Sequence, residues 1–175
     1  MARVSSIEAD QASPEVKEIY EQTLKGKPGS VQKLMAHRPQ MLKNFLPFYA
    51  SVGRSLDRKL YEMIYIRVSM INECKYCLQH HLAASKRVGL TPTDWAALKA
   101  GNYSSFAPKE AGALTYADKL TRSPQSANAD DFVGLKQHFN DAEIVDLHSL
   151  VGLVNLTNRV TGPLDADLEF PEERI

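Results

Sequence analysis

Helix-start and helix-stop signals follow one another at short intervals along this chain. Ser13 with Pro14, and Thr91 with Pro92, each combine a capping residue with a proline suited to the first helical turn. The period-two alternation of half-buried strands and Asn-Gly or Asp-Gly hairpin turns are both absent. The chain is therefore predicted to be all-α, with about eight or nine helices over residues 14–24, 30–36, 39–49, 55–72, 74–88, 92–100, 108–122, 128–139 and 140–161.

Two of these segments are apolar around much of the helix circumference. One spans residues 55–72, and the other has nearly uninterrupted apolar residues between 144 and 156. A helix of this kind has to be surrounded by protein, either at the centre of a domain or at a subunit interface. We therefore expect a compact helical fold that assembles into a homo-oligomer.

Composition limits the size and the partners of the protein. A length of 175 residues with 43% hydrophobic content suffices for one good core, so a single domain over residues 1–175 is expected. Basic and acidic residues number 21 each, which argues against binding to nucleic acid or to an anionic membrane. The N-terminus lacks the apolar run of a signal peptide, and no segment is long and apolar enough to cross a membrane, so a cytoplasmic location is expected.

The two cysteines of the chain, Cys74 and Cys77, form a Cys-X-X-Cys motif at the start of a predicted helix. Unpaired N–H groups and the positive end of the helix dipole favour a thiolate there, which makes the motif a candidate nucleophile. In a reducing compartment, this spacing indicates a redox or metal pair rather than a structural disulfide. Leu78 follows Cys77, so the haem-attachment motif is not met, and a zinc site would need two further ligands.

Two more residues complete the predicted site. His81 lies four residues after Cys77, one helical turn along the same face, where it can act as a base for the thiol. Glu62 stands in the middle of the apolar 55–72 helix, where an ionised carboxylate needs a partner. We therefore interpret Glu62 as the proton acceptor behind His81.

The order Glu62, Cys74, Cys77, His81 resembles the signature of the alkylhydroperoxidase D-like branch of the carboxymuconolactone decarboxylase family. The similarity extends from the segment SPEVKEIY to the last long helix. It implies a trimer or hexamer in which Cys77 attacks a hydroperoxide, Cys74 donates a proton and resolves the sulfenic acid, and Glu62 with His81 relays protons. It also implies a dithiol or lipoyl-type reductant, with no metal and no organic cofactor.

One residue departs from the pattern of the best-known members, because Tyr76 stands where they have a second histidine. A phenol with a pKa near ~10 is a poor base, so a shorter relay is expected. The family also contains true lactone decarboxylases, which lack the cysteine pair. Two alternatives to a peroxidase remain open at this point: a disulfide reductase or electron carrier for a lipoyl-type partner, and a non-catalytic helical oligomer with a redox-sensing pair.

Overall fold

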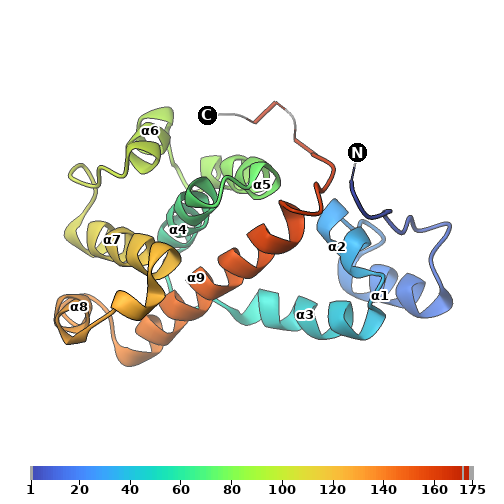
Figure 1. Cartoon of the computed structure of the whole chain (residues 1–175), viewed down its shortest axis with the longest axis horizontal. Coiled ribbons are helices and arrows are strands. Elements are labelled where there is room, and N and C mark those ends of the chain that lie inside the picture. Colours follow the sequence, from blue (N-terminus) through green and yellow to red (C-terminus); the bar gives the residue numbers. More distant parts are fainter. Residues whose placement is uncertain (1, 171, 174–175) are drawn as a thin grey trace.

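The computed structural model describes residues 2–170 and 172–173, and this part of the chain contains helices and no strand (Figure 1). The all-α prediction is therefore confirmed. The elements are α1 (Pro14–Leu24), α2 (Ser30–Met35), α3 (Pro39–Ser51), α4 (Arg58–Ile71), α5 (Lys75–Lys86), α6 (Pro92–Ala100), α7 (Pro108–Arg122), the 3-10 helix η1 (Pro124–Ser126), α8 (Ala129–Leu135) and α9 (Asp141–Thr161).

The helices begin where their capping residues predict. The Ser13 side chain accepts a hydrogen bond from the Val16 backbone N–H at the start of α1. Asn140 and Glu143 form a reciprocal capping box at the start of α9. The α4 helix starts later than its apolar pattern suggested, because the Asp57 side chain accepts from the first free N–H groups.

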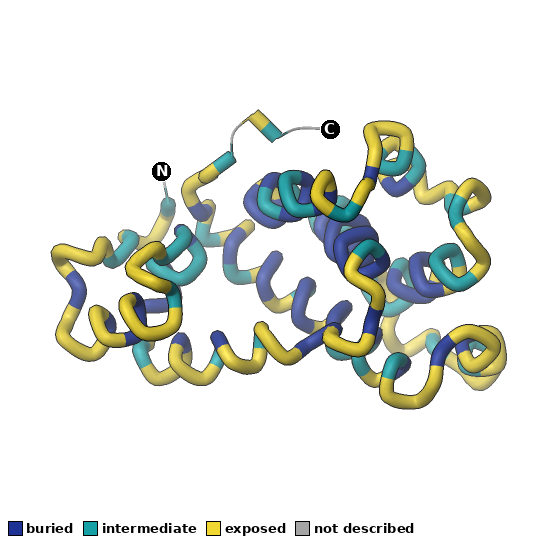
Figure 2. Tube along the Cα trace, turned by 180° about the vertical axis from the view of Figure 1, so that it is seen from behind, coloured by how far each residue is buried: buried dark blue, intermediate teal, exposed yellow. Residues whose placement is uncertain are grey.

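The α4 helix lies at the centre of the molecule and contacts α5, α6, α7 and α9. Every residue from 60 to 69 is buried, and this stretch forms the continuous dark segment of Figure 2. Arg67 is the basic residue of this buried stretch. Its guanidinium is almost wholly buried and donates two hydrogen bonds to the Asp118 carboxylate, of 2.7 and 2.6 Å. A buried cation requires such a partner.

The N-terminal helices form a smaller core beside the main one. Residues of α1, α2 and α3 pack together at the side of the molecule that carries the N-terminus (Figure 1). Val31 and Phe45 contact both this cluster and the main core. The two clusters are thus joined through apolar contacts, and a single domain over residues 1–175 remains our prediction.

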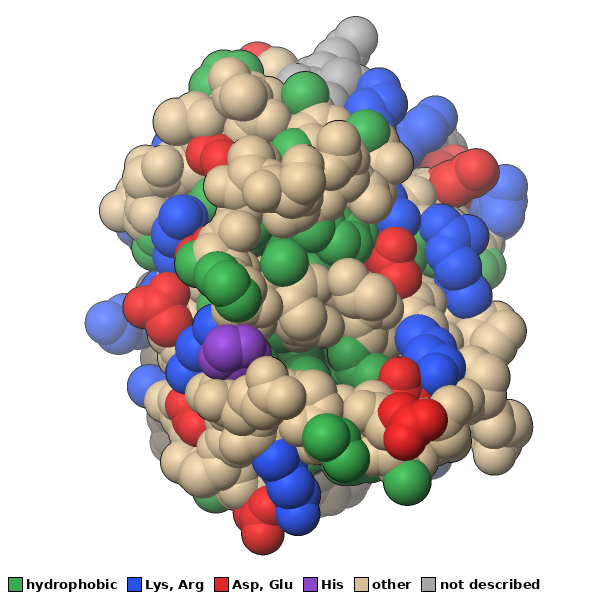
Figure 3. All heavy atoms as spheres, turned by 90° about the vertical axis from the view of Figure 1, so that its left-hand side faces the viewer, with side chains coloured by type: hydrophobic (Ala, Val, Ile, Leu, Met, Phe, Trp, Pro, Cys, Tyr) green, Lys and Arg blue, Asp and Glu red, His purple; other side chains and the backbone are tan. Residues whose placement is uncertain are grey.

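Large apolar residues are exposed on several helices, among them Met41 and Phe48 on α3, Val133 on α8, and Val145 and Leu156 on α9. Residues 60–69 of α4, by contrast, are buried within one chain. The homo-oligomer therefore remains a prediction, and α9, unlike the centre of α4, still offers exposed apolar residues for it. Figure 3 shows the end formed by α6, α7 and α8, where apolar side chains lie in recesses between charged ones. None of the helices in the described part of the chain is long and apolar enough to span a membrane.

Candidate active site

The turn between α4 and α5 holds Cys74 in place. Glu73 adopts the left-handed conformation with φ of 53°, which reverses the chain direction directly before the motif. The Cys74 N–H then donates to the Ser69 carbonyl at 2.9 Å. The Asn158 amide of α9 donates to the Ser69 hydroxyl at 3.1 Å and accepts from the Asn72 amide at 2.9 Å. These bonds fix the end of α4 against α9.

Cys74 caps the N-terminus of α5 with its sulfur, which accepts a hydrogen bond from the Cys77 N–H at 3.4 Å. Both cysteines are free thiols, with only 1% and 3% of their surfaces exposed. The Thr161 hydroxyl of α9 lies 3.1 Å from the Cys74 sulfur and 3.3 Å from the Cys77 sulfur. The structure therefore brings the two thiols together around one hydroxyl group.

The two thiols differ in acidity. The pKa of Cys74 is lowered to about 6, because Cys77 donates a hydrogen bond to its thiolate and Thr161 and the helix N–H groups add to this. The pKa of Cys77 is raised, because it supplies that hydrogen bond and is buried. The first proton is therefore lost more readily from Cys74, which favours a monoanion with the remaining proton on Cys77.

Glu62 and His81 form the second half of the site. Glu62 is fully buried, and its Oε2 lies 2.6 Å from His81 Nδ1. The other carboxylate oxygen of Glu62, Oε1, lies 2.6 Å from the Arg58 guanidinium. The two groups form an ion pair but not a directed hydrogen bond. The Arg58 side chain is 62% exposed, so the buried carboxylate is neutralised from the surface side. The predicted pairing of Glu62 with His81 is present.

Glu62 by itself favours the protonated form of His81, but burial acts in the opposite direction. The pKa of His81 is lowered, because the cost of burying an imidazolium exceeds the favourable contribution of Glu62. His81 is therefore neutral at pH 7. Since a carboxylate only accepts hydrogen bonds, Nδ1 carries the proton and Nε2 keeps a free lone pair. His81 is thus in the form that can receive a proton.

Tyr61 and Tyr65 of α4 lie against this histidine, and Tyr49 of α3 lies beside these two tyrosines. The Tyr65 ring is stacked on the His81 ring, with 3.3 Å between centroids and an angle of 13°. The Tyr65 hydroxyl is 2.8 Å from the Thr157 hydroxyl on α9. Burial raises the pKa of Tyr65 and of Tyr61 on α4 and of Tyr49 on α3. These rings remain neutral and fix the orientation of His81.

Tyr76, the residue between the cysteines, faces away from the sulfurs toward the C-terminal segment. Its hydroxyl donates to the Glu169 carboxylate at 3.0 Å and accepts from the Val31 N–H at 3.4 Å. Burial and the nearby Glu169 charge raise the pKa of Tyr76. It therefore cannot replace a catalytic histidine at neutral pH, and its contacts are those of a structural tie.

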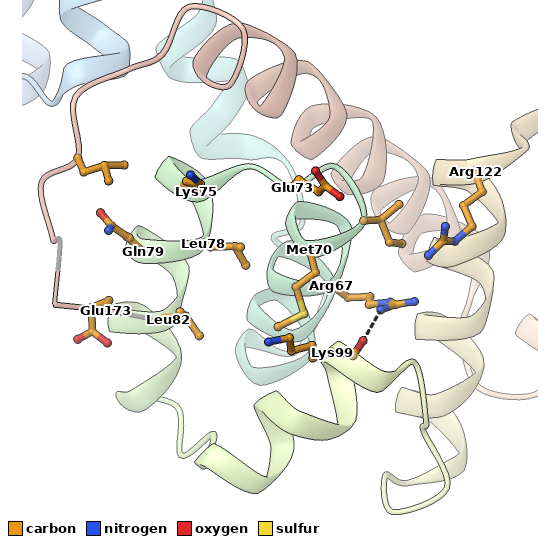
Figure 4. A pocket seen from close by; sticks show the side chains of 12 residues that line it. Arg67, Met70, Glu73, Lys75, Leu78, Gln79, Leu82, Lys99, Arg122 and Glu173 are labelled. Atoms are coloured by element: carbon orange, nitrogen blue, oxygen red, sulfur yellow. Dashed lines mark hydrogen bonds between the residues drawn. The ribbon is translucent and has the colours of Figure 1, made fainter. Parts of the chain in front are cut away.

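A cavity of about 900 Å³ lies on the adjacent face of α5 and is not lined by either cysteine. Leu78 of α5 and Met70 of α4 point toward one another across it (Figure 4). Arg67 at its edge donates to the Lys99 carbonyl at 3.4 Å. We therefore place the reactive centre at the buried thiols and not in this cavity. Within the described residues, no group of three or more His, Cys, Asp or Glu side chains could hold a metal ion.

The contribution of α9 to the site was not predicted from the sequence. Thr157, Asn158 and Thr161 are buried polar residues near the C-terminal end of this helix. Polar side chains at i, i+1 and i+4 of a buried helix indicate a shared polar partner. This signal was present in the sequence, but the partner lies more than 80 residues away along the chain.

Comparison with known proteins agrees with this fold. Residues 39–119 match the model of the carboxymuconolactone decarboxylase family. The protein YdfG of Bacillus subtilis is 29% identical over 109 residues, which are 61% of this chain and 74% of that protein.

Two solved structures share nearly the whole fold. A peroxidase-related protein from Silicibacter sp. TM1040 is 28% identical with a TM-score of 0.83, over 98% of this chain and 93% of that one. A peroxidase-related protein with an alkylhydroperoxidase AhpD core, from Ralstonia eutropha JMP134, is 22% identical with a TM-score of 0.82, over 96% and 92%. The predicted alkylhydroperoxidase D-like fold is confirmed.

Proposed function

We propose that this protein is a thiol-dependent hydroperoxide reductase, and the match of residues 39–119 to the carboxymuconolactone decarboxylase family model supports the proposal. The observation that carries the proposal is the presence of two free thiols at the start of α5 and a buried Glu62–His81 pair, in which His81 lies one helical turn after Cys77. The similarity to a peroxidase-related protein supports an antioxidant role.

The resting monoanion can supply both the nucleophile and the proton that reduction requires. The proton on Cys77 passes to the Cys74 thiolate along their hydrogen bond. The Cys77 thiolate attacks the terminal oxygen of the hydroperoxide, the O–O bond breaks, and the alkoxide takes the proton from Cys74. An alcohol leaves, and Cys77 becomes a sulfenic acid.

The second step closes the disulfide. The Cys74 thiolate, which is the stable form of this thiol, attacks the Cys77 sulfur. The S–O bond breaks, and the hydroxide takes a proton relayed by His81 and leaves as water. Glu62 stabilises the imidazolium that forms in this relay. One hydroperoxide, one thiolate, one thiol and one proton that His81 takes up from solvent thus give one alcohol, one water and one disulfide, and an external dithiol of the lipoyl type restores the pair.

Burial of both sulfurs suggests which hydroperoxides react. Because only 1% and 3% of the cysteine surfaces are exposed, a bulky substrate has to displace more protein than a small one. We therefore expect hydrogen peroxide and small alkyl hydroperoxides to react faster than cumene hydroperoxide. Equal second-order rate constants for all three would contradict a buried reaction centre.

A second function is favoured by the low pKa of Cys74 in particular. Thiol–disulfide exchange is fastest when the attacking thiol has a pKa near the ambient pH. The same pair could therefore serve as a disulfide reductase or electron carrier for a lipoyl-type partner. This alternative predicts rapid reduction of lipoamide without consumption of hydroperoxide.

Single-cysteine variants test the assignment of roles. We expect Cys74→Ser to consume one equivalent of hydroperoxide and stop at a Cys77 sulfenic acid, and Cys77→Ser to consume almost none. Mass spectrometry after dimedone trapping reads out the oxidised residue. A Cys74 sulfenic acid in Cys77→Ser, with no oxidation in Cys74→Ser, would show that Cys74 attacks the peroxide and Cys77 resolves the sulfenic acid. The proposed peroxidase activity would still stand.

A further inference from the structure

The Thr161 hydroxyl is the polar group that α9 brings closest to the reactive pair. Its oxygen lies within 3.1 and 3.3 Å of the two sulfurs, and the residue is 1% exposed. Thr161 lies near the C-terminal end of α9, outside the segment 39–119 that matches the family model. Its position at the sulfurs therefore depends on the packing of α9 against α4 and α5 (Figure 1).

A hydroxyl group has one hydrogen to donate, and here it points to the backbone. The Thr161 hydroxyl donates to the Thr157 carbonyl at 2.8 Å, so its lone pairs face the sulfurs. In this orientation it can accept a hydrogen bond from a thiol. It cannot donate one to a thiolate unless it rotates away from the carbonyl.

After that rotation, the Thr157 carbonyl still has a hydrogen-bond donor. Within a regular α-helix, the Thr157 carbonyl also accepts the backbone N–H of Thr161. The hydroxyl bond to it is therefore a second, dispensable bond. A thiolate within 3.1 Å offers a charged acceptor instead, and hydrogen bonds to charged groups are the stronger kind.

We propose that Thr161 is a catalytic residue whose hydroxyl turns from the Thr157 carbonyl to whichever sulfur carries the negative charge. Because it contacts both sulfurs, it can follow the charge from Cys74 to Cys77 and back as the reaction proceeds. This role deepens the proposed thiol chemistry of the pair and rests on it. It is separable from hydroperoxide reduction, because it concerns the thiolate itself.

The neighbouring polar groups are already engaged. The Thr157 hydroxyl is bound to Tyr65. The Asn158 amide is bound between Ser69 and Asn72, and it also contributes to lowering the pKa of Cys77. Thr161 contributes to lowering the pKa of both cysteines. The other titratable groups around the pair, from α3, α4 and α5, are Tyr49, Glu62, Tyr65, Tyr76 and His81.

The experiment compares variants that separate the hydroxyl from the side-chain volume. Thr161→Ser keeps the hydroxyl and lacks the methyl group, whereas Thr161→Ala lacks both, and Thr161→Val keeps the shape and lacks the hydroxyl. Thr121→Val is the matched control, because Thr121 makes the same 2.8 Å intrahelical bond to a carbonyl with no sulfur beside it. The rate of iodoacetamide alkylation is measured against pH, without any peroxide.

We expect Thr161→Val and Thr161→Ala to alkylate about tenfold more slowly at slightly acidic pH, because the first thiolate loses one hydrogen bond. Thr161→Ser and Thr121→Val should retain the original profile. An unchanged profile in folded Thr161→Ala or Thr161→Val would overturn the role of the hydroxyl, even if the protein reduces peroxide. Conversely, the expected profiles with no peroxide consumption by the unaltered protein would refute only the proposed function.

Discussion

Replacing Glu62 by glutamine removes the buried charge behind His81 while it preserves the side-chain shape. The 2.6 Å bond to His81 then becomes a bond between neutral groups. Hydrogen bonds to charged groups contribute about 1.5–3 kcal/mol and neutral ones about 0.5–1.5 kcal/mol. If Glu62→Gln removes about 1–1.5 kcal/mol of the stabilisation of the His81 imidazolium, turnover should be about tenfold slower.

Replacing Arg58 provides a matched control, because it should shift the pKa of His81 in the direction opposite to Glu62→Gln. Glu62 raises the pKa of His81 against the larger effect of burial, whereas Arg58 lowers it in the same direction as burial. We therefore expect Glu62→Gln to lower the His81 pKa further and Arg58→Gln to raise it. Arg58 is largely exposed, so its removal should leave the fold intact.

The assay is hydroperoxide consumption against pH, with circular dichroism as a check of the fold and NMR titration of the His81 ring. We expect hydroperoxide consumption to slow about tenfold in Glu62→Gln. The pKa of His81 should shift in opposite directions in Glu62→Gln and Arg58→Gln. Full activity in a folded Glu62→Gln protein, or shifts in the same direction, would show that Glu62 does not act through His81.

Three further outcomes are expected. Tyr76→Phe should lower the free energy of unfolding in urea by about 1 kcal/mol and spare the thiol chemistry, because it loses the bond to Glu169. The pKa of His81 in the folded protein lies below its unfolded value of about 6.5. The contribution of His81 to stability is therefore present above that pH and is lost as the pH falls through the folded pKa. On acidification, the free energy of unfolding should fall less in His81→Gln than in the unaltered protein. Light scattering should give a mass above the 19.5 kDa of one chain, and Leu156→Glu should reduce it, whereas a monomer in both cases would refute assembly through α9.

The sequence predicted the helices because their signals are local. The caps at Ser13, Thr91 and Asn140 lie within three residues of the N–H groups they satisfy, and all three occur in the structure. The Glu62–His81 pair could also be inferred, because a carboxylate in an apolar helix needs a partner.

Other features depend on contacts that no local pattern encodes. Arg67 and Asp118 are 51 residues apart, and Cys74 and Thr161 are 87 apart, so these pairs follow from helix packing. The sign of the His81 pKa shift depends on how burial compares with pairing, and the sequence does not specify the depth of burial. The same holds for the division of charge between the two cysteines.

The central claim is that Cys74 and Cys77 together reduce a hydroperoxide. The most direct measurement mixes the fully reduced protein with one equivalent of hydrogen peroxide in the absence of any reductant. We expect one peroxide and both free thiols to be lost per chain, with a Cys74–Cys77 disulfide in the peptide map. Peroxide that persists while both thiols stay free in the folded protein would contradict it.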